Sequence, residues 1–104
     1  MAVIIVATVY PAPEHREEVI AAFEAAIGKV HAEEDGCELY ALHEGPDGRL
    51  VMIEKYASDD AVAAHRAGAG LAALREALGG KLSAPMDLQV LAPHPAGSPA
   101  KGAL

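Results

Sequence analysis

Four residues that could take part in proton transfer lie close together in the chain: His31, Glu34, Cys37 and Tyr40. In a helix, His31 and Glu34 would share one face at a spacing of three residues, so they could form a hydrogen bond. Histidine is well suited to accept a proton near neutral pH, which makes His31 a candidate base. A simpler interpretation stays open, because a histidine near the carboxyl end of a helix is also favoured by the helix dipole.

A second pair, Glu54 and Tyr56, alternates with Leu50 and Met52 in a segment typical of a β-strand. Alternation places the acid and the phenol on one face of that strand. A carboxylate on a buried face must be paired, so both groups could orient a ligand. The alternative is a glutamate at a surface edge and a tyrosine that serves only for packing.

His65 lies among alanines in the segment 61–66, shortly before Gly68 and Gly70. Small neighbours and a helix broken by glycine would leave space for a ligand over the sheet, so His65 is the second candidate base. A solvated histidine without a function is the alternative. We expect Cys37, the only cysteine, to serve in packing alone.

The usual templates for metal sites and nucleophiles are missing from the sequence. There is no His-Glu-x-x-His motif, no pair of cysteines, no nucleophile elbow and no glycine loop that would hold a phosphate. Gly68-Ala69-Gly70 alone is too weak a signal, and the length and expected strand order leave no room for a Rossmann cofactor site. We therefore expect neither a metal nor a bound cofactor.

The elements that must position these residues follow from hydrophobic spacing and from glycine and proline. We predict strands over 2–10, 37–43, 50–56 and 86–91, a helix over 13–34, and a second helix over 58–78 that is broken at Gly68 and Gly70. The order β-α-β-β-α-β predicts an α+β fold of ferredoxin-like topology. Such a fold has a four-stranded antiparallel sheet with both helices on one face.

Apolar side chains on both faces of the predicted sheet point to a homodimer. The strands over 2–10 and 50–56 are apolar on both sides, whereas two helices can cover only one side. Each Å² of apolar surface left in water forfeits about 25 cal/mol, and a two-fold contact between two sheets removes that cost. We assign residues 1–93 to the domain. Residues 94–104, rich in proline and glycine, form a tail that is either flexible or in contact with the partner.

Composition narrows the classes of partner and the compartment. The 104 residues carry a formal net charge of −7, without a cluster of Lys and Arg, which argues against binding to nucleic acid or to an anionic membrane. A small neutral or aromatic ligand fits better. A single cysteine allows no disulfide within the chain, and the apolar start is too short for a signal or a membrane span, so we expect a cytoplasmic protein.

The sequence resembles the antibiotic biosynthesis monooxygenase (ABM) domain family, and in particular its small quinol-monooxygenase-like bacterial members. The resemblance rests on His31-x-x-Glu34-x-Gly36-Cys37-x-x-Tyr40, on Ile53-Glu54-Lys55-Tyr56-Ala57-Ser58, on Ala64-His65 and on the Pro-Ala-Gly-x-Pro-Ala-Lys-Gly tail. It implies a dimeric α+β barrel with a pocket between sheet and helices in each subunit. It also implies oxygenation of quinols or polycyclic aromatics without metal or flavin.

Two departures from the family pattern bear on the substrate. Tyr56 stands where relatives commonly have a tryptophan, and the chain has no tryptophan at all. Relatives that degrade haem use a histidine late in the crossover, and none occurs here between His65 and His94, which disfavours haem ligation.

The leading hypothesis is a cofactor-independent monooxygenase that acts on a small quinol or polycyclic aromatic with O2. His65 or His31 would take a phenolic proton, since such a reaction needs a base and a preorganised site for the anion. Tyr40 and Tyr56 would bind the ring oxygens, and Glu54 and Glu34 would complete the substrate site. The alternatives are an isomerase or a non-catalytic ligand-binding protein on the same scaffold, or a purely structural dimer module.

Overall fold

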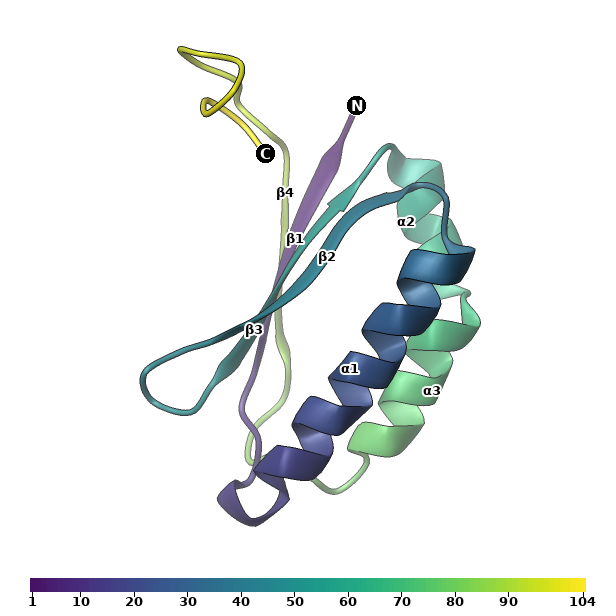
Figure 1. Cartoon of the computed structure of the whole chain (residues 1–104), viewed down its shortest axis with the longest axis vertical. Helices are drawn as coiled ribbons and strands as arrows, with labels where there is room; N and C mark the ends of the chain where they lie inside the picture. Colours follow the sequence, from purple (N-terminus) through teal and green to yellow (C-terminus); the bar gives the residue numbers. More distant parts are fainter.

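The chain folds into one antiparallel β-sheet with helices packed against a single face (Figure 1). The computed structural model describes residues 1–104. The strands are β1 (Val3–Val9), β2 (Cys37–Glu44), β3 (Leu50–Tyr56) and β4 (Asp87–Leu91). The helices are the 3-10 turn η1 (Pro13–His15), α1 (Arg16–Glu33), α2 (Asp59–Arg66) and α3 (Ala69–Leu78). Every predicted element is present, with ends that differ from the predicted ones by a few residues.

The strand order β2-β3-β1-β4, antiparallel throughout, confirms the ferredoxin-like topology. β1 lies in the centre between β3 and β4, so the first and last strands of the chain are neighbours. α1 and α3 run side by side along the covered face, and α2 lies beyond the end of β3 (Figure 1).

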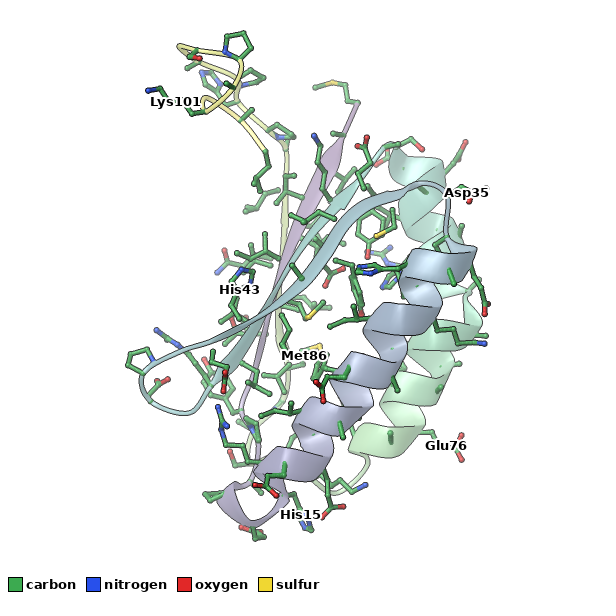
Figure 2. The ribbon with its side chains drawn as sticks, in the orientation of Figure 1. His15, Asp35, His43, Glu76, Met86 and Lys101 are labelled. Atoms are coloured by element: carbon green, nitrogen blue, oxygen red, sulfur yellow. The ribbon has the colours of Figure 1, made fainter.

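Alternation along the two central strands separates a covered face from an open face. Val9, Leu50 and Met52 point toward the helices and are fully buried with Phe23 of α1. The intervening residues of both strands, Ile4, Val6, Val51 and Ile53 among them, point to the face that carries no helix. His43 of β2 is seen on that same side, away from the helices, whereas Met86 lies between sheet and helices (Figure 2).

The end of α1 is shaped by a close contact with the start of α2. α1 ends at Glu33, and Glu34 leaves the helix in an extended conformation. A Cβ atom at Gly36 would lie 2.6 Å from the Cβ atom of Ala61, so glycine is needed for the two segments to approach. This contact places α2 directly against the turn between α1 and β2.

The crossover after β3 is a broken helix, as the two glycines predict. Ser58 begins α2 as its N-cap, with its Oγ accepting a hydrogen bond from the Ala61 amide over 3.2 Å. The chain turns at Ala67 and Gly68, and α3 then packs along α1. The break lets α2 reach the end of the sheet while α3 covers its middle.

β4 pairs with β1 but lies beyond the helices that cover the other strands. Leu88 and Val90 point to the helix side of the sheet and are nevertheless 59% and 57% exposed. After Leu91 the chain has no further helix or strand. The tail curls on itself and extends away from the helices, with the Lys55 Nζ donating to the carbonyl of Leu104 (Figure 1). The expectation that 94–104 is flexible or contacts a partner stays a prediction.

None of the helices combines the length and the apolar character needed to cross a bilayer.

Candidate functional site

A cavity of about 300 Å³ lies between the sheet and the helices α2 and α3. Its walls are mainly apolar side chains from both layers, including Ile5, Met52, Leu71, Leu74, Leu88 and Val90. β4 forms one wall because no helix covers it. The exposed Leu88 and Val90 therefore line a site that is large enough for a small aromatic ligand.

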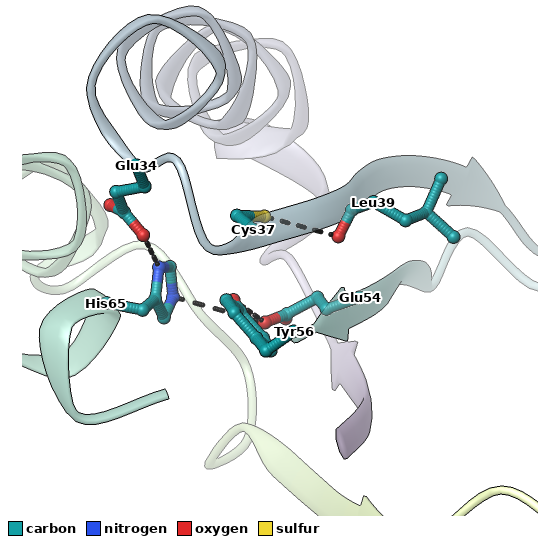
Figure 3. Close-up of polar contacts among 6 residues, drawn as sticks. All are labelled: Glu34, Cys37, Leu39, Glu54, Tyr56 and His65. Atoms are coloured by element: carbon teal, nitrogen blue, oxygen red, sulfur yellow. Dashed lines mark hydrogen bonds and ion pairs between the residues drawn. The ribbon is translucent and has the colours of Figure 1, made fainter. Parts of the chain in front are cut away.

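One end of the cavity is polar and is built around His65 of α2. The His65 Nδ1 and Glu34 Oε1 atoms are 2.8 Å apart, and the two side chains are only 6% and 12% exposed (Figure 3). The approach of α2 to the turn at Gly36 brings these residues together, although 31 positions separate them in the chain. A carboxylate at Nδ1 fixes that nitrogen as the proton donor and leaves Nε2 free to accept.

The other ring nitrogen of His65 faces Glu54 of β3. The His65 Nε2 and Glu54 Oε1 atoms are 4.0 Å apart, too far for a hydrogen bond (Figure 3). Glu54 Oε1 instead accepts a hydrogen bond of 2.6 Å from the Tyr56 hydroxyl. A hydroxyl oxygen placed about 2.8 Å from both Nε2 and Oε1 would see them at an angle of roughly 90°, so one substrate oxygen could contact both.

The rings of Tyr40 and Tyr56 enclose the imidazole. Their centroids are 5.3 Å and 5.1 Å from that of His65, with the Tyr40 ring edge-on. No buried polar side-chain atom of the protein lacks a hydrogen-bond partner. Neither the Tyr40 hydroxyl nor the His65 Nε2 is bonded to protein, so both must be open to the cavity, whose lining includes both residues.

Burial dominates the electrostatics of this end of the cavity. It raises the pKa of Glu54, against the opposing effects of the Tyr56 hydroxyl and His65. It also raises the pKa of Tyr40 and of Tyr56, and the negative charge of Glu54 adds to the rise at both phenols. Both tyrosines therefore stay protonated. Tyr56 donates its proton to Glu54, whereas the Tyr40 hydroxyl can donate to an oxygen anion in the cavity.

The predicted site residues fall into three groups. Tyr40, Glu54 and His65 line the cavity itself. Tyr56 and Glu34 lie behind it, bonded to Glu54 and His65 respectively. Glu34 therefore acts on the position of the imidazole rather than on a ligand.

His31, the other candidate base, lies outside the cavity. Its side chain is exposed, and its Nε2 is 3.1 Å from the carbonyl oxygen of Tyr40. The hydrogen bond with Glu34 that their helical spacing would allow is not formed, because Glu34 leaves the helix axis and turns toward His65. Through this contact His31 joins the end of α1 to β2.

The Cys37 thiol lies beside this cluster. It is half-buried, and its Sγ donates to the carbonyl oxygen of Leu39 over 3.4 Å. Burial and the nearby Glu34 raise the pKa of the thiol to about 11, so it is almost entirely protonated at neutral pH. Such a thiol is a poor nucleophile, in keeping with a packing role.

Two cavity residues, Arg66 and Arg75, were not predicted as site residues from the sequence. Both line the cavity from the helix side, at the ends of α2 and α3. Each directly follows a residue that faces the sheet, His65 or Leu74. That adjacency is the signal that could have found them, since a long side chain next to the buried stripe of a helix reaches its border.

No group of three or more His, Cys, Asp and Glu side chains is arranged to hold a metal ion. The chemistry available to the side chains themselves is proton transfer at Nε2 of His65, and hydrogen bonding by Tyr40 and Glu54. The site can therefore take a proton from a hydroxyl group in apolar surroundings and hold the resulting anion.

Comparison with known proteins places this chain in a family. The model of the family described as "Antibiotic biosynthesis monooxygenase" matches residues 2–77, a range that includes all six predicted site residues but not β4. The chain is 37% identical over 92 residues to "Putative monooxygenase Rv0793" of Mycobacterium tuberculosis, covering 88% of this chain and 90% of that protein.

Solved structures agree with the sequence match. The structure of Rv0793 from Mycobacterium tuberculosis superposes with a TM-score of 0.87 at 34% identity, covering 94% of this chain and all of that one. A structure from Caulobacter crescentus, described as a "putative antibiotic biosynthesis monooxygenase", superposes with a TM-score of 0.83 at 28% identity, covering 86% and 87% of the two chains. By sequence and by fold, this chain belongs to the antibiotic biosynthesis monooxygenase family.

Proposed function

We propose that this protein is a cofactor-independent monooxygenase that uses O2 to oxidise a small quinol or polycyclic aromatic phenol. The observation that carries the proposal is the orientation of His65. Its Nδ1 is held by Glu34, and its Nε2 is open to an apolar cavity beside the Tyr40 hydroxyl and the buried Glu54. Family membership supports the reaction class.

The proposed reaction needs no electron donor other than its substrate. In an anthrone, for example, two C–H bonds of one ring carbon are replaced by a C=O bond. One oxygen atom of O2 enters the product, the other leaves as water, and the substrate supplies the electrons for both. Removal of the hydroxyl proton makes the ring an electron-rich anion that can pass an electron to O2, so the protein has to supply a base and anion-stabilising groups.

Each residue near the polar end has a definite role in this proposal. Nε2 of His65 takes the hydroxyl proton, and Glu34 stabilises the imidazolium that forms because it accepts the Nδ1–H bond. The Tyr40 hydroxyl donates to the anionic oxygen. Tyr56 holds Glu54 in place by its 2.6 Å hydrogen bond, and Glu54, in the protonated form that burial favours, donates to the substrate oxygen whose own proton faces Nε2. His31 has no part in the reaction.

We also propose that the working unit is a cytoplasmic homodimer. The single free cysteine allows no disulfide within the chain, which supports the cytoplasm as the compartment. The open face of the sheet carries Ile4, Val6, Val51 and Ile53 with no helix over them. Ile4 is already buried within the single chain, and a second copy packed on this face would complete the burial of the partly exposed Val6, Val51 and Ile53 by a two-fold contact. The cavity lies on the opposite face, so each subunit would keep its own site.

Consumption of dissolved oxygen with a panel of hydroquinones and anthrones tests the proposed reaction. We expect uptake with at least one compound. We also expect Glu34→Gln to lower kcat with a smaller effect on KM, because it weakens the hydrogen bond that positions the His65 imidazole. Product formation that continues unchanged without oxygen would instead identify an isomerase. Binding without any product would identify a ligand-binding protein.

A further inference from the structure

Two of the four arginines of this protein have no ion-pair partner, and both line the cavity. Arg16 and Arg49 are paired with Glu44 and Asp47. Arg66 and Arg75 take part in no ion pair or side-chain hydrogen bond, although the chain has 15 acidic residues for 8 lysines and arginines. In so acidic a protein, two free guanidinium groups at one site call for an explanation.

The charges around the cavity are separated by depth. The only acidic side chain in its lining is Glu54, which is 5% exposed and lies at the inner, polar end beside His65. Arg66 and Arg75 are exposed and belong to the outer rim, together with Leu88 of the uncovered strand β4. A ligand that fits this pattern is apolar in the middle, has a hydroxyl group at one end and carries a negative charge at the other.

We propose that the natural substrate is an aromatic acid, a phenol or quinol that also bears a carboxylate, and that Arg66 and Arg75 bind this carboxylate at the rim of the cavity. The proposal rests on the proposed function in taking the occupant of the cavity to be the substrate. Guanidinium groups suit the task because their donors match the geometry of a carboxylate. The whole-chain charge of −7 favours a neutral ligand, but the two arginines reverse that preference locally.

The two arginines also set the orientation of the substrate. With its carboxylate at the rim, the hydroxyl group enters first and reaches Nε2 of His65. The opposite orientation would take the carboxylate out of water at the inner end of the cavity, beside the buried Glu54 and without an arginine as its partner. Arg66 and Arg75 therefore select both the class of ligand and the end of it that meets the base.

Binding of a matched pair of probes tests this inference without any need for turnover. The probes are 6-hydroxy-2-naphthoate and the neutral 6-hydroxy-2-naphthamide, whose fluorescence reports binding to the full-length protein in the absence of oxygen. We expect the acid to bind about tenfold more tightly than the amide, and added salt to weaken only the acid. Equal affinities, or no binding of either probe, would overturn the proposal.

Substituting each arginine in turn measures its contribution to binding of the acid. Arg66→Gln and Arg75→Gln should each weaken binding of the acid by about three- to tenfold and leave binding of the amide unchanged. Arg49→Gln, which removes an arginine outside the cavity, is the matched control and should change neither. If Arg66→Gln and Arg75→Gln lower thermal stability without changing affinity for the acid, the arginines serve only the helix dipoles and the proposal is overturned.

The outcome is independent of the test for oxygenation. Tight, arginine-dependent binding of the acid by a protein that consumes no oxygen would refute the monooxygenase and keep the aromatic acid as ligand. Oxygen uptake at equal rates with acidic and neutral substrates would keep the monooxygenase and refute the role of the arginines.

Discussion

Replacing Tyr56 by phenylalanine removes one hydroxyl group from the interior and leaves the Glu54 carboxyl without its donor. The hydroxyl lies 2.6 Å from Glu54 Oε1, and the two residues are 0% and 5% exposed. A hydrogen bond to a charged group contributes about 1.5–3 kcal/mol, whereas one between neutral groups contributes about 0.5–1.5 kcal/mol. We expect Tyr56→Phe to lower the free energy of unfolding by about 2 kcal/mol when Glu54 is ionised. The same change should cost about 1 kcal/mol in a Glu54→Gln background.

The dependence of this loss on pH follows from the direction of the Glu54 pKa. Burial raises this pKa in the folded protein, so the folded state binds the proton more tightly than the unfolded state. The resulting stabilisation is complete below the unfolded pKa and is lost as pH rises through the folded pKa. The Tyr56 hydroxyl limits that loss because it stabilises the charged form. The cost of Tyr56→Phe should therefore grow from acid to alkaline pH, and Glu54→Gln should abolish this growth.

Urea denaturation of the four proteins of this double-mutant cycle, at fixed protein concentration and at several pH values, measures the effect. We expect a coupling of about 1 kcal/mol between the two positions at alkaline pH and a smaller one at acid pH. A coupling that is zero, or that is the same at every pH, would refute the inference that the Tyr56 hydroxyl stabilises the charged form of Glu54.

Three further predictions concern the fold, the dimer and the thiol. Gly36→Ala would place a Cβ atom 2.6 Å from that of Ala61 and should cost about 1–3 kcal/mol of stability. Adding Ala61→Gly should recover part of this loss, and strictly additive losses in thermal denaturation would argue against the contact. Ile53→Lys puts a charge on the open face and should convert a dimer to a monomer in sedimentation equilibrium. The control Glu24→Lys, on the exposed side of α1, should leave the dimer intact. A dimer that survives Ile53→Lys would exclude this interface. Cys37, with its pKa of about 11, should react slowly with a disulfide reagent at neutral pH and faster as pH rises, and fast reaction at neutral pH would contradict its burial.

The order of elements was readable from the sequence because each signal acts over a few residues. The continuous apolar run over the first strand predicts a strand covered on both faces. Ser58 before two aspartates marks a helix start, and in the structure its side chain caps the Ala61 amide. The break at Gly68 follows from the same local chemistry. Such signals fix the type of each element and, with the rules of connection, the topology.

The partner of His65 was not readable, because it depends on packing between segments far apart in the chain. A local rule pairs Glu34 with His31, three residues away on the same helix. In the structure the helix ends at Glu33, and the close contact of Gly36 with Ala61 brings His65 to Glu34 instead. His31, Glu34 and His65 were all predicted as site residues from the sequence, but only the packing of α2 decides which histidine faces the cavity.

The rim of the cavity could not be predicted from the sequence for a similar reason. The segment over 86–91 is recognisable as a strand, but its sequence does not say that the helices stop short of it. Leu88 and Val90 become a cavity wall only because α3 leaves them uncovered. Arg66 and Arg75 look like ordinary surface arginines until the walls on either side of them are in place.

The central claim, that His65 is the base of an oxygenation in this cavity, is tested most directly by the fate of labelled oxygen. The protein and its His65→Gln variant are incubated with an anthrone or hydroquinone substrate under dioxygen labelled with oxygen-18, and the product is examined by mass spectrometry. We predict that one labelled atom enters the product and that His65→Gln, while folded, slows its formation by a factor of about 10²–10⁴, as expected for loss of a general base. Product without label, or a variant as fast as the unchanged protein, would contradict the account.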